Sequence, residues 1–259
     1  MQTALITGAN SGIGHALARV LSREGYRLIL VGRHKEAIAK VADELPNSHA
    51  IIVDLSTPNA AQEVFVQVEK LGFDIDLLVN NAGVGTYGPF WKNDLEAEHA
   101  LLMTNMVAVV DLTRLILPGM LQRKQGRILN LGSMAAFLSA PYAATYYASK
   151  SFILTFSEGL RQSLRGTGVS LTVVCPGPTT GTHFGKLAAE PGARQGFSLP
   201  HRSAAQVAEA AYAGLMDNKA VVIPGSLNAA AISVLVHLPR ELVARMIGRG
   251  QRYVLRRRG

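Results

Sequence analysis

A tyrosine and a lysine four residues apart, Tyr146 and Lys150, form the pattern with the clearest chemical meaning in this sequence. On a helix, this spacing places both side chains on the same face. A free phenol has a pKa of about 10 and is a poor base at neutral pH, but a neighbouring ammonium favours the phenolate and lowers that pKa. Such a tyrosine can donate a proton to a carbonyl oxygen or remove one from an alcohol. The pair therefore predicts proton transfer at a carbonyl or alcohol group.

Ser133 is a second candidate for the same chemistry. It lies just beyond an apolar run at 126–131, and its hydroxyl could hydrogen-bond a substrate oxygen and stabilise developing charge. Tyr147 competes with Tyr146, because a spacing of three residues from Lys150 gives it a similar facing. A lone tyrosine and lysine on an amphipathic helix can also be a simple surface pair, so the assignment depends on the rest of the chain.

The elements that would hold these residues alternate between short apolar runs and helical stretches. The pattern predicts strands at 2–7, 27–31, 50–53, 75–80, 126–131, 170–175 and 220–223. It predicts helices at 13–24, 35–45, 95–120, 144–165 and 203–217, with another opening at Pro58 and with Ser203 as a helix cap. This alternation is typical of an α/β fold with a doubly wound parallel sheet and helices on both faces. No linker divides the chain, so we expect one Rossmann-type domain at 1–226 and a basic, helical C-terminal extension at 227–259.

A glycine-rich segment, TGANSGIG at 7–14, joins the first expected strand to the first expected helix. Gly8 would allow a tight turn, Gly12 a close approach to a pyrophosphate, and Gly14 close packing of the helix on the strand. The helix N-terminus would present N–H groups to phosphate oxygens. The alternative, a glycine-rich turn without a ligand, fits this position poorly. The expected dinucleotide contacts are Gly8, Asn10, Ser11, Gly12, Ile13 and Gly14.

Further motifs follow in a fixed order: Asp54-Leu55, NNAG at 80–83, Asn105, Ser133, Tyr146-x-x-x-Lys150 and Pro176-Gly177. With the glycine loop, they make the sequence similar to the short-chain dehydrogenase/reductase family over residues 2 to about 224. The resemblance implies a seven-stranded sheet of order 3-2-1-4-5-6-7, a nicotinamide cofactor and hydride transfer at an alcohol/carbonyl pair. It also implies a homodimer or homotetramer formed through the two long helices.

The resemblance assigns roles to individual residues. It selects Tyr146 over Tyr147 for proton transfer and makes Lys150 a hydrogen-bond donor to the nicotinamide ribose. It implies that Asn105 kinks its helix and holds a water in a relay to Lys150, whereas the alternative is a structural hydrogen bond between helices. The expected catalytic set is Ser133, Tyr146, Lys150 and Asn105.

Several cofactor contacts are also implied by the resemblance. Asp54 would contact the adenine, the backbone at 81–83 would follow the adenine ribose, and Pro176-Gly177 would form the turn beside the nicotinamide. The family threonine after this turn is displaced or duplicated here; we assign it to Thr179 and leave open which hydroxyl within 179–182 touches the cofactor. Beyond the glycine loop, the expected contacts are Arg33, Asp54, Leu55, Asn81, Ala82, Gly83, Tyr146, Lys150, Pro176, Gly177 and Thr179.

The end of the second expected strand indicates which cofactor binds. An NAD site usually has an acidic residue there for the ribose 2′-hydroxyl. This chain has Gly32 followed by Arg33, and a guanidinium can pair with a 2′-phosphate. We therefore predict NADP(H). The alternative for Arg33 is a solvated residue at a helix start. Neither the seven histidines nor the single cysteine has zinc-ligand spacing, so no metal is expected.

The substrate side is mostly apolar. The candidate pocket residues are Val84, Phe90, Phe137, Leu138, Tyr142, His183 and Phe184. Such a lining favours a small-molecule ketone or alcohol on an acyl, steroid-like or aromatic body, although each residue alone could belong to the core. The segment 182–200 is irregular and rich in glycine and proline, which predicts a lid over the substrate; the alternative is a plain surface connection.

The net charge of +8 is concentrated near the C-terminus, where residues 240–259 hold seven arginines and one glutamate. Leu242, Val243, Met246 and Ile247 could share one helix face there, either packed on the domain or lying on an anionic membrane surface. We favour packing. No nucleic-acid module is present. The single cysteine and the absence of a signal-peptide pattern predict a cytoplasmic protein, peripheral at a membrane only if the second alternative holds.

Two other functions compete with an enzyme. A non-catalytic NADP(H)-binding regulator would tolerate loss of Tyr146 or Lys150, and a membrane-surface scaffold would tolerate a broken glycine loop. All three features are intact in this sequence.

Overall fold

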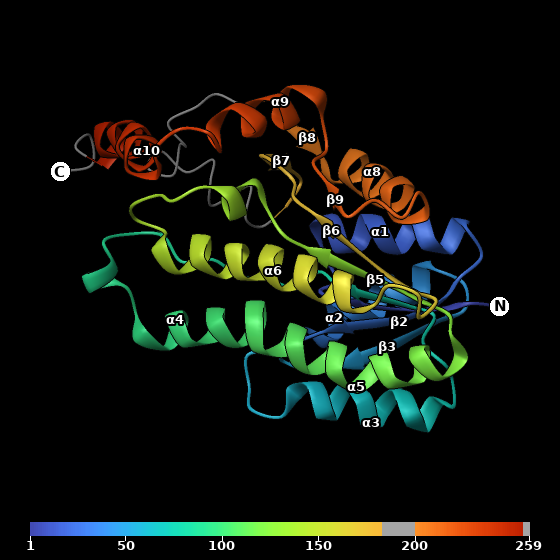
Figure 1. Ribbon diagram of the computed structural model, residues 1–259. Coiled ribbons are helices and arrows are strands. Elements are labelled where there is room, and N and C mark those ends of the chain that lie inside the picture. The colour runs from blue at the N-terminus through green and yellow to red at the C-terminus, as the bar shows by residue number, and fades with distance from the viewer. Residues whose placement is uncertain (183–199, 256–259) are drawn as a thin grey trace.

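The computed structural model describes residues 1–182 and 200–255, with side chains as far as Arg249. Its centre is a seven-stranded parallel sheet (Figure 1). The strands are β1 (Thr3–Thr7), β2 (Arg27–Gly32), β3 (Ser48–Ile52), β4 (Leu77–Asn80), β5 (Gly126–Leu131), β6 (Val169–Val174) and β9 (Val221–Val222). Their order, β3-β2-β1-β4-β5-β6-β9, is the order that the resemblance implied, with β9 as the seventh strand. The predicted fold class is confirmed.

Helices cover both faces of the sheet (Figure 1). They are α1 (Gly12–Arg23), α2 (Lys35–Glu44), α3 (Ala60–Leu71), α4 (Leu95–Leu102), α5 (Ala108–Arg123), α6 (Ala144–Ser163), α8 (Ala204–Met216), α9 (Ser226–Leu235) and α10 (Arg240–Leu255). Successive strand residues point to opposite faces. In β1, Ile6 therefore joins the core under α1, α2 and α8, while Leu5 joins the core under α3 and α5. Burial on both faces explains why these strands are continuous apolar runs.

The long helix expected at 95–120 is present but is not uniform. Between α4 and α5, residues Met103–Val107 form a π-helical turn, in which each carbonyl accepts from a more distant N–H than in an α-helix. The whole stretch Leu95–Arg123 is long and apolar enough to cross a membrane. In this fold, Leu101, Leu112 and Ile116 are buried in the domain, as in a core helix.

Two short features lie on either side of residues 183–199. Thr179–Thr180 (β7) pairs with Arg202–Ser203 (β8) in a small separate sheet that the sequence did not predict. Ser203 then caps α8, as expected: its hydroxyl accepts from the backbone N–H of Gln206, and the Gln206 side chain accepts from the Ser203 N–H. The small sheet and the cap hold the chain in place on both sides of residues 183–199.

The C-terminal extension forms α9 and α10. Val243 and Ile247 are 3% and 2% exposed, whereas Leu242 and Met246 are 46% and 36% exposed. The four residues expected on one apolar face are therefore split, and only Val243 and Ile247 face the domain. Figure 1 shows α10 at the end of the molecule toward which the strands run. Of the two alternatives for this helix, packing on the domain is the one observed.

A glycine at a tight turn provides a stability test. Gly168, just before β6, has a φ of +84°, and a Cβ there would lie 1.9 Å from the Lys124 carbonyl oxygen. We expect Gly168→Ala to lower the free energy of unfolding by about 3 kcal/mol, from left-handed strain and overpacking together. Gly159→Ala, in α6 with nothing within 4 Å of its Cβ, should raise it by up to about 1 kcal/mol. Urea unfolding measures both; equal effects would contradict the turn geometry.

Candidate active site

Tyr146 and Ser133 meet beyond the C-terminal end of β5. Ser133 begins a short 3-10 helix, Met134–Phe137, and its hydroxyl accepts from the backbone N–H of Ala135 at 3.1 Å. Tyr146 lies in the first turn of α6, is 8% exposed, and its side chain is hydrogen-bonded to Ser133. Ligands of doubly wound sheets bind at this end of the strands. The structure therefore brings together the two hydroxyls that the sequence placed in one site.

Lys150 lies one helical turn after Tyr146. Its Nζ donates to the carbonyl oxygen of Leu131 at 2.9 Å and lies 5.9 Å from the centre of the Tyr146 ring. The side chain is 6% exposed. Gly83, in the loop after β4, borders the same atom, because a Cβ at Gly83 would lie 3.4 Å from Nζ. The ammonium thus lies between the ends of β4 and β5.

Burial is the largest influence on the pKa values of both Tyr146 and Lys150. Burial raises the pKa of Tyr146 to about 12, although the hydrogen bond with Ser133 acts to lower it. Burial lowers the pKa of Lys150 to about 8. In the chain alone, desolvation of the phenolate is the largest effect on the pKa of Tyr146. The expectation that the ammonium and a positive nicotinamide together make the phenol more acidic stays a prediction. Tyr147 is also buried, which raises its pKa well above the usual value.

Asn105 lies inside the π-helical turn and is 1% exposed. Its amide nitrogen donates to the Val84 carbonyl at 2.9 Å and to the Ser149 hydroxyl at 3.0 Å, and its oxygen accepts from the Val84 N–H at 2.9 Å. The link to Ser149 is the helix–helix hydrogen bond considered as the alternative role. Across Gly83, the same side chain lies near Lys150. The water relay stays a prediction.

The glycine loop has the shape that a dinucleotide requires. Gly8 and Gly12 have φ values of +65° and +55°, and a Cβ on Gly14 would lie 2.2 Å from the Gly8 carbonyl oxygen. The Asn81 side chain donates to the carbonyls of Thr7 and Gly8 at 2.8 and 3.1 Å. No side chain caps the N-terminus of α1, so the first-turn N–H groups keep their capacity for phosphate oxygens. These residues fit a nucleotide pyrophosphate.

The other end of the cofactor site lies after β2 and β3. Arg33 is exposed, and its Nε donates to His34 Nε2 at 3.2 Å. Burial acts to raise the pKa of Asp54, but hydrogen bonds from Ser56 and the nearby Arg33 charge lower it overall. Leu55 is buried beside it. The guanidinium and the carboxylate therefore lie close enough to interact at the edge of the sheet.

The segment after β6 separates the candidate threonines. The Thr179 hydroxyl donates to the Gly177 carbonyl at 2.9 Å and is buried. Thr182 lies against the glycine loop instead, since a Cβ on Gly12 would be 3.1 Å from its methyl group. The Thr182 hydroxyl itself donates to the Thr179 carbonyl at 3.1 Å. The assignment of the cofactor contact to Thr179 stays a prediction, and so does the choice among the hydroxyls of 179–182.

The expected substrate residues divide into groups. Val84 and Leu138 pack with Tyr146 and Tyr147 in one apolar cluster. Phe137 is partly buried and packs against a different cluster, which contains Ile153, Leu154 and Cys175. Phe90 is 62% exposed. Tyr142 has a φ of +63°, rare for a large side chain, and its ring is 6.5 Å from that of Tyr87. His183, Phe184 and most of the expected lid lie outside the described residues.

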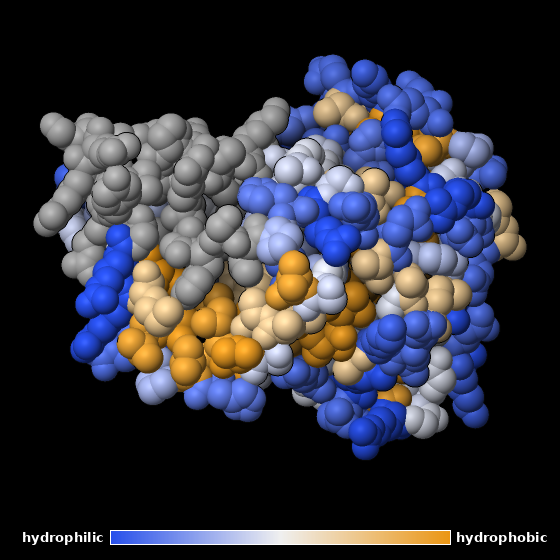
Figure 2. All heavy atoms as spheres, turned by 90° about the horizontal axis from the view of Figure 1, so that it is seen from above, coloured by the Kyte–Doolittle hydropathy of each residue, from blue (hydrophilic) through white to orange (hydrophobic). Residues whose placement is uncertain are grey.

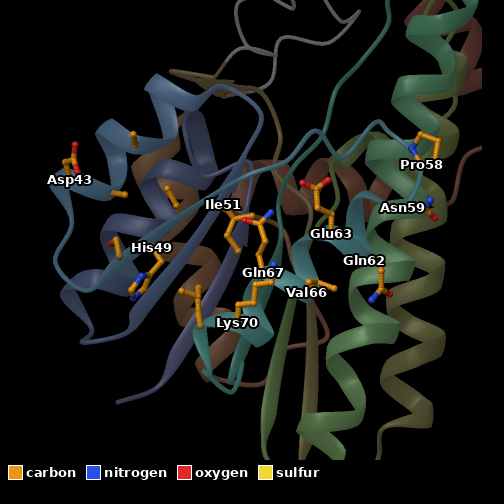
Figure 3. Close-up of a pocket in the computed structure, with 15 residues that line it drawn as sticks. Asp43, His49, Ile51, Pro58, Asn59, Gln62, Glu63, Val66, Gln67 and Lys70 are labelled. Atoms are coloured by element: carbon orange, nitrogen blue, oxygen red, sulfur yellow. The ribbon is translucent and has the colours of Figure 1, made fainter.

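One hollow on the described residues lies apart from this site. A groove of about 970 Å³ lies between α2, β3 and α3, with Asp43, His49, Glu63 and Lys70 among its lining residues (Figure 3). It lies at the β3 edge of the sheet, and no expected site residue lines it. The candidate site is therefore defined by the hydrogen bonds among its residues and not by this groove. Within the described part of the chain, no cluster of three potential metal ligands occurs.

A parallel sheet with a glycine loop after its first strand defines a nucleotide-binding protein of the Rossmann type. A model of the short chain dehydrogenase family matches residues 2–191. The chain belongs to the short-chain dehydrogenase family and is an oxidoreductase of that family. The predicted membership of this family is confirmed.

Individual relatives share the same region. The ketoacyl reductase HetN of Nostoc is 34% identical over 180 residues, which are 68% of this chain and 63% of that protein. The NADP-dependent 3-hydroxy acid dehydrogenase YdfG of Escherichia coli K12 is 36% identical over 187 residues, 71% of this chain and 75% of the relative. A short-chain dehydrogenase from Sphingobium yanoikuyae, solved with NADPH, has a TM-score of 0.79 at 27% identity and covers 93% of this chain and 97% of its own.

The buried ammonium predicts a specific dependence of stability on pH. The pKa of Lys150 falls from 10.5 to about 8 on burial, so the unfolded chain binds more protons between these values and stability rises with pH across that window. From about pH 7 to about pH 9.5, wild type should gain about 2 kcal/mol relative to Lys150→Met, measured by urea unfolding. Lys40→Met removes an exposed lysine and should show no such pH-dependent gap. A gap independent of pH for Lys150→Met would contradict the burial argument.

Proposed function

We propose that this protein is an NADP(H)-dependent oxidoreductase that reduces a carbonyl group, or oxidises the corresponding alcohol, on a mainly apolar small molecule. The observation that carries the proposal is the hydrogen bond of Tyr146 with Ser133, one turn from the buried Lys150. Hydrogen bonds of Asn81 with the glycine loop, and the position of Lys150 Nζ 3.4 Å from where a Cβ on Gly83 would lie, join this set to the expected nucleotide site. Proton transfer and hydride transfer can therefore occur in one place.

The reduction needs a hydride at carbon and a proton at oxygen. NADPH, when bound, supplies the hydride. Tyr146 is protonated at neutral pH, because burial raises its pKa to about 12, and it donates its proton to the carbonyl oxygen. Ser133 hydrogen-bonds the same oxygen and stabilises the charge that develops on it. Lys150 donates to the Leu131 carbonyl and would also donate to the ribose of the bound cofactor.

The choice of NADP(H) rests on Arg33. Solved structures similar to this chain include complexes with NADPH and with NAD, so similarity alone does not decide between them. An exposed guanidinium directly after β2, with no acidic residue at the strand end, favours a 2′-phosphate. The NADP dependence in the name of the Escherichia coli relative supports the same choice.

The substrate class rests on the apolar cluster around the tyrosines. Val84, Leu138 and Leu101 pack there with Tyr146 and Tyr147. Such surroundings suit an acyl, steroid-like or aromatic ketone. The relatives named as a ketoacyl reductase and a 3-hydroxy acid dehydrogenase support the acyl alternative.

Partner and location are part of the proposal. Leu95, Leu102 and Val107 are exposed along α4 and the π-helical turn, which supports a homodimer or homotetramer formed through these helices. Cys175 is a buried free thiol, as suits a cytoplasmic protein. Burial of Val243 and Ile247 leaves a membrane-surface scaffold Leu242 and Met246 as the large exposed apolar side chains on the described part of α10. The second candidate, an NADP(H)-binding regulator without turnover, is the outcome that the first experiment below would reveal.

Replacement of the phenol tests the chemistry. Tyr146→Phe should lower kcat by about 10²- to 10⁴-fold, since it removes only the proton donor. Absorbance of NADPH over a panel of ketones measures this. Tyr147→Phe removes a buried hydroxyl from the neighbouring residue and should leave kcat within about threefold. Full activity in Tyr146→Phe would refute the mechanism, and NADPH binding without turnover of any carbonyl by wild type would favour the regulator.

Replacement of the guanidinium tests the cofactor. Arg33→Ala should raise the Kd for NADPH by about 10- to 100-fold, because it removes charge-assisted hydrogen bonds, and should change the Kd for NADH by less than about threefold. Fluorescence titration of the reduced cofactors measures both constants without any substrate. Lys40→Ala removes the same charge from an exposed position on α2 and serves as the control. Unchanged preference in Arg33→Ala would remove the argument for NADP(H).

A further inference from the structure

The C-terminal helix α10 packs directly onto the apolar cluster that contains the candidate catalytic tyrosine. Val243 and Ile247 belong to one buried cluster with Tyr146 and Tyr147. The other members come from α4, from the segment between β5 and α6, and from the ends of α9: Leu101, Ala135, Ala140 and Ala143, with Val84, Leu138, Leu235 and Leu238 packed at its edge. Two of the residues expected in the substrate pocket, Val84 and Leu138, are thus shared between the pocket and the contact with α10.

A second contact brings the helix backbone close to the same region. A Cβ on Gly248 would lie 2.9 Å from Cγ of Pro141. Pro141 belongs to the connection between the Ser133 helix and α6, next to Tyr142 with its φ of +63°. Only a residue without a side chain allows this approach. The position of α10 is therefore fixed against the segment that joins Ser133 to Tyr146.

The helix lies outside the part of the chain that the family model matches. That match ends at residue 191, and α10 begins at Arg240. The shared part contains the glycine loop, Ser133, Tyr146 and Lys150. On the described part of α10, the buried side chains Val243 and Ile247 are aliphatic, and they contribute volume and shape to the cluster that contains Tyr146.

We propose that α10 forms a wall of the substrate cleft, and that Val243 and Ile247 determine how large a group beside the carbonyl can be accepted. The proposal deepens the proposed function and rests on it. Close-packed aliphatic walls select by volume: one methylene in an apolar pocket changes the specificity constant by about 10-fold or more. Shortening either side chain opens space beside Tyr146, because surrounding residues relax only partly into a cavity.

The experiment compares substrates, not rates alone. Full-length Val243→Ala and Ile247→Ala are assayed with NADPH on a series of ketones that differ only in the size of one substituent. The ratio of kcat/KM for the bulkiest to the smallest ketone should rise by at least about tenfold in each variant. Leu242→Ala makes the same kind of truncation on the exposed face of α10 and should leave the ratio within about twofold.

Folding and catalysis are separated by two further measurements. Urea unfolding identifies variants that remain folded; if Ile247→Ala does not, Ile247→Val replaces it, with a smaller shift expected in the same direction. The proposal is overturned if the kcat/KM ratio stays at the wild-type value in folded variants. It is also overturned if the ratio changes as much in Leu242→Ala. Wild-type turnover that is lost in Tyr146→Phe shows that the proposed function stands whichever way the ratio falls, so the two failures are distinguishable.

Discussion

Burial of one ammonium group, that of Lys150, is the constraint to which the rest of the site is fitted. Removing a cation from water is costly unless it is paired or well hydrogen-bonded. In the described part of the chain, Lys150 makes no salt bridge; its nitrogen donates to the Leu131 carbonyl, and the missing side chain of Gly83 leaves it room. Its pKa accordingly falls to about 8. A group held at this cost is typical of a functional site, because an apolar residue of the same size would pack more stably.

Two asparagines keep this group in register with the nucleotide loop. Asn81 hydrogen-bonds the carbonyls of Thr7 and Gly8, so the loop after β4 cannot move independently of the glycine loop. Asn105 then holds Val84, at the end of the same loop, and reaches Ser149 on α6. Asn105 lies in the π-helical turn, and its amide reaches Val84 and Ser149 while the long helix continues. The glycine loop, the β4 loop and α6 therefore form one connected unit.

Much of this arrangement could be predicted from the sequence, and the failures have physical causes. The central strands were evident because both faces of a parallel sheet are buried, whereas β3, at the edge and half exposed, was predicted two residues short at its start and one residue too long at its end. The threonines of 179–182 could not be ranked, because a choice depends on contacts with the glycine loop, which is distant in sequence. The faces of α10 were misjudged for the same reason: periodicity finds an apolar stripe but not the cluster that receives it.

The protonation of Tyr146 shows most clearly what a sequence pattern leaves out. The spacing of Tyr146 and Lys150 predicts attraction between ammonium and phenolate, but it contains no information about how dry the site is. Burial places the pKa of the phenol at about 12, so only about one molecule in 10⁵ carries a phenolate at neutral pH. Lys150, with a pKa of about 8, remains mostly cationic there. A protonated phenol beside a cation readily donates a proton to a carbonyl oxygen, whereas accepting one from an alcohol requires higher pH or additional positive charge at the phenol. In the chain alone, the buried pair is therefore set to donate a proton at neutral pH, and the positive charge needed for the reverse transfer must come from outside the pair.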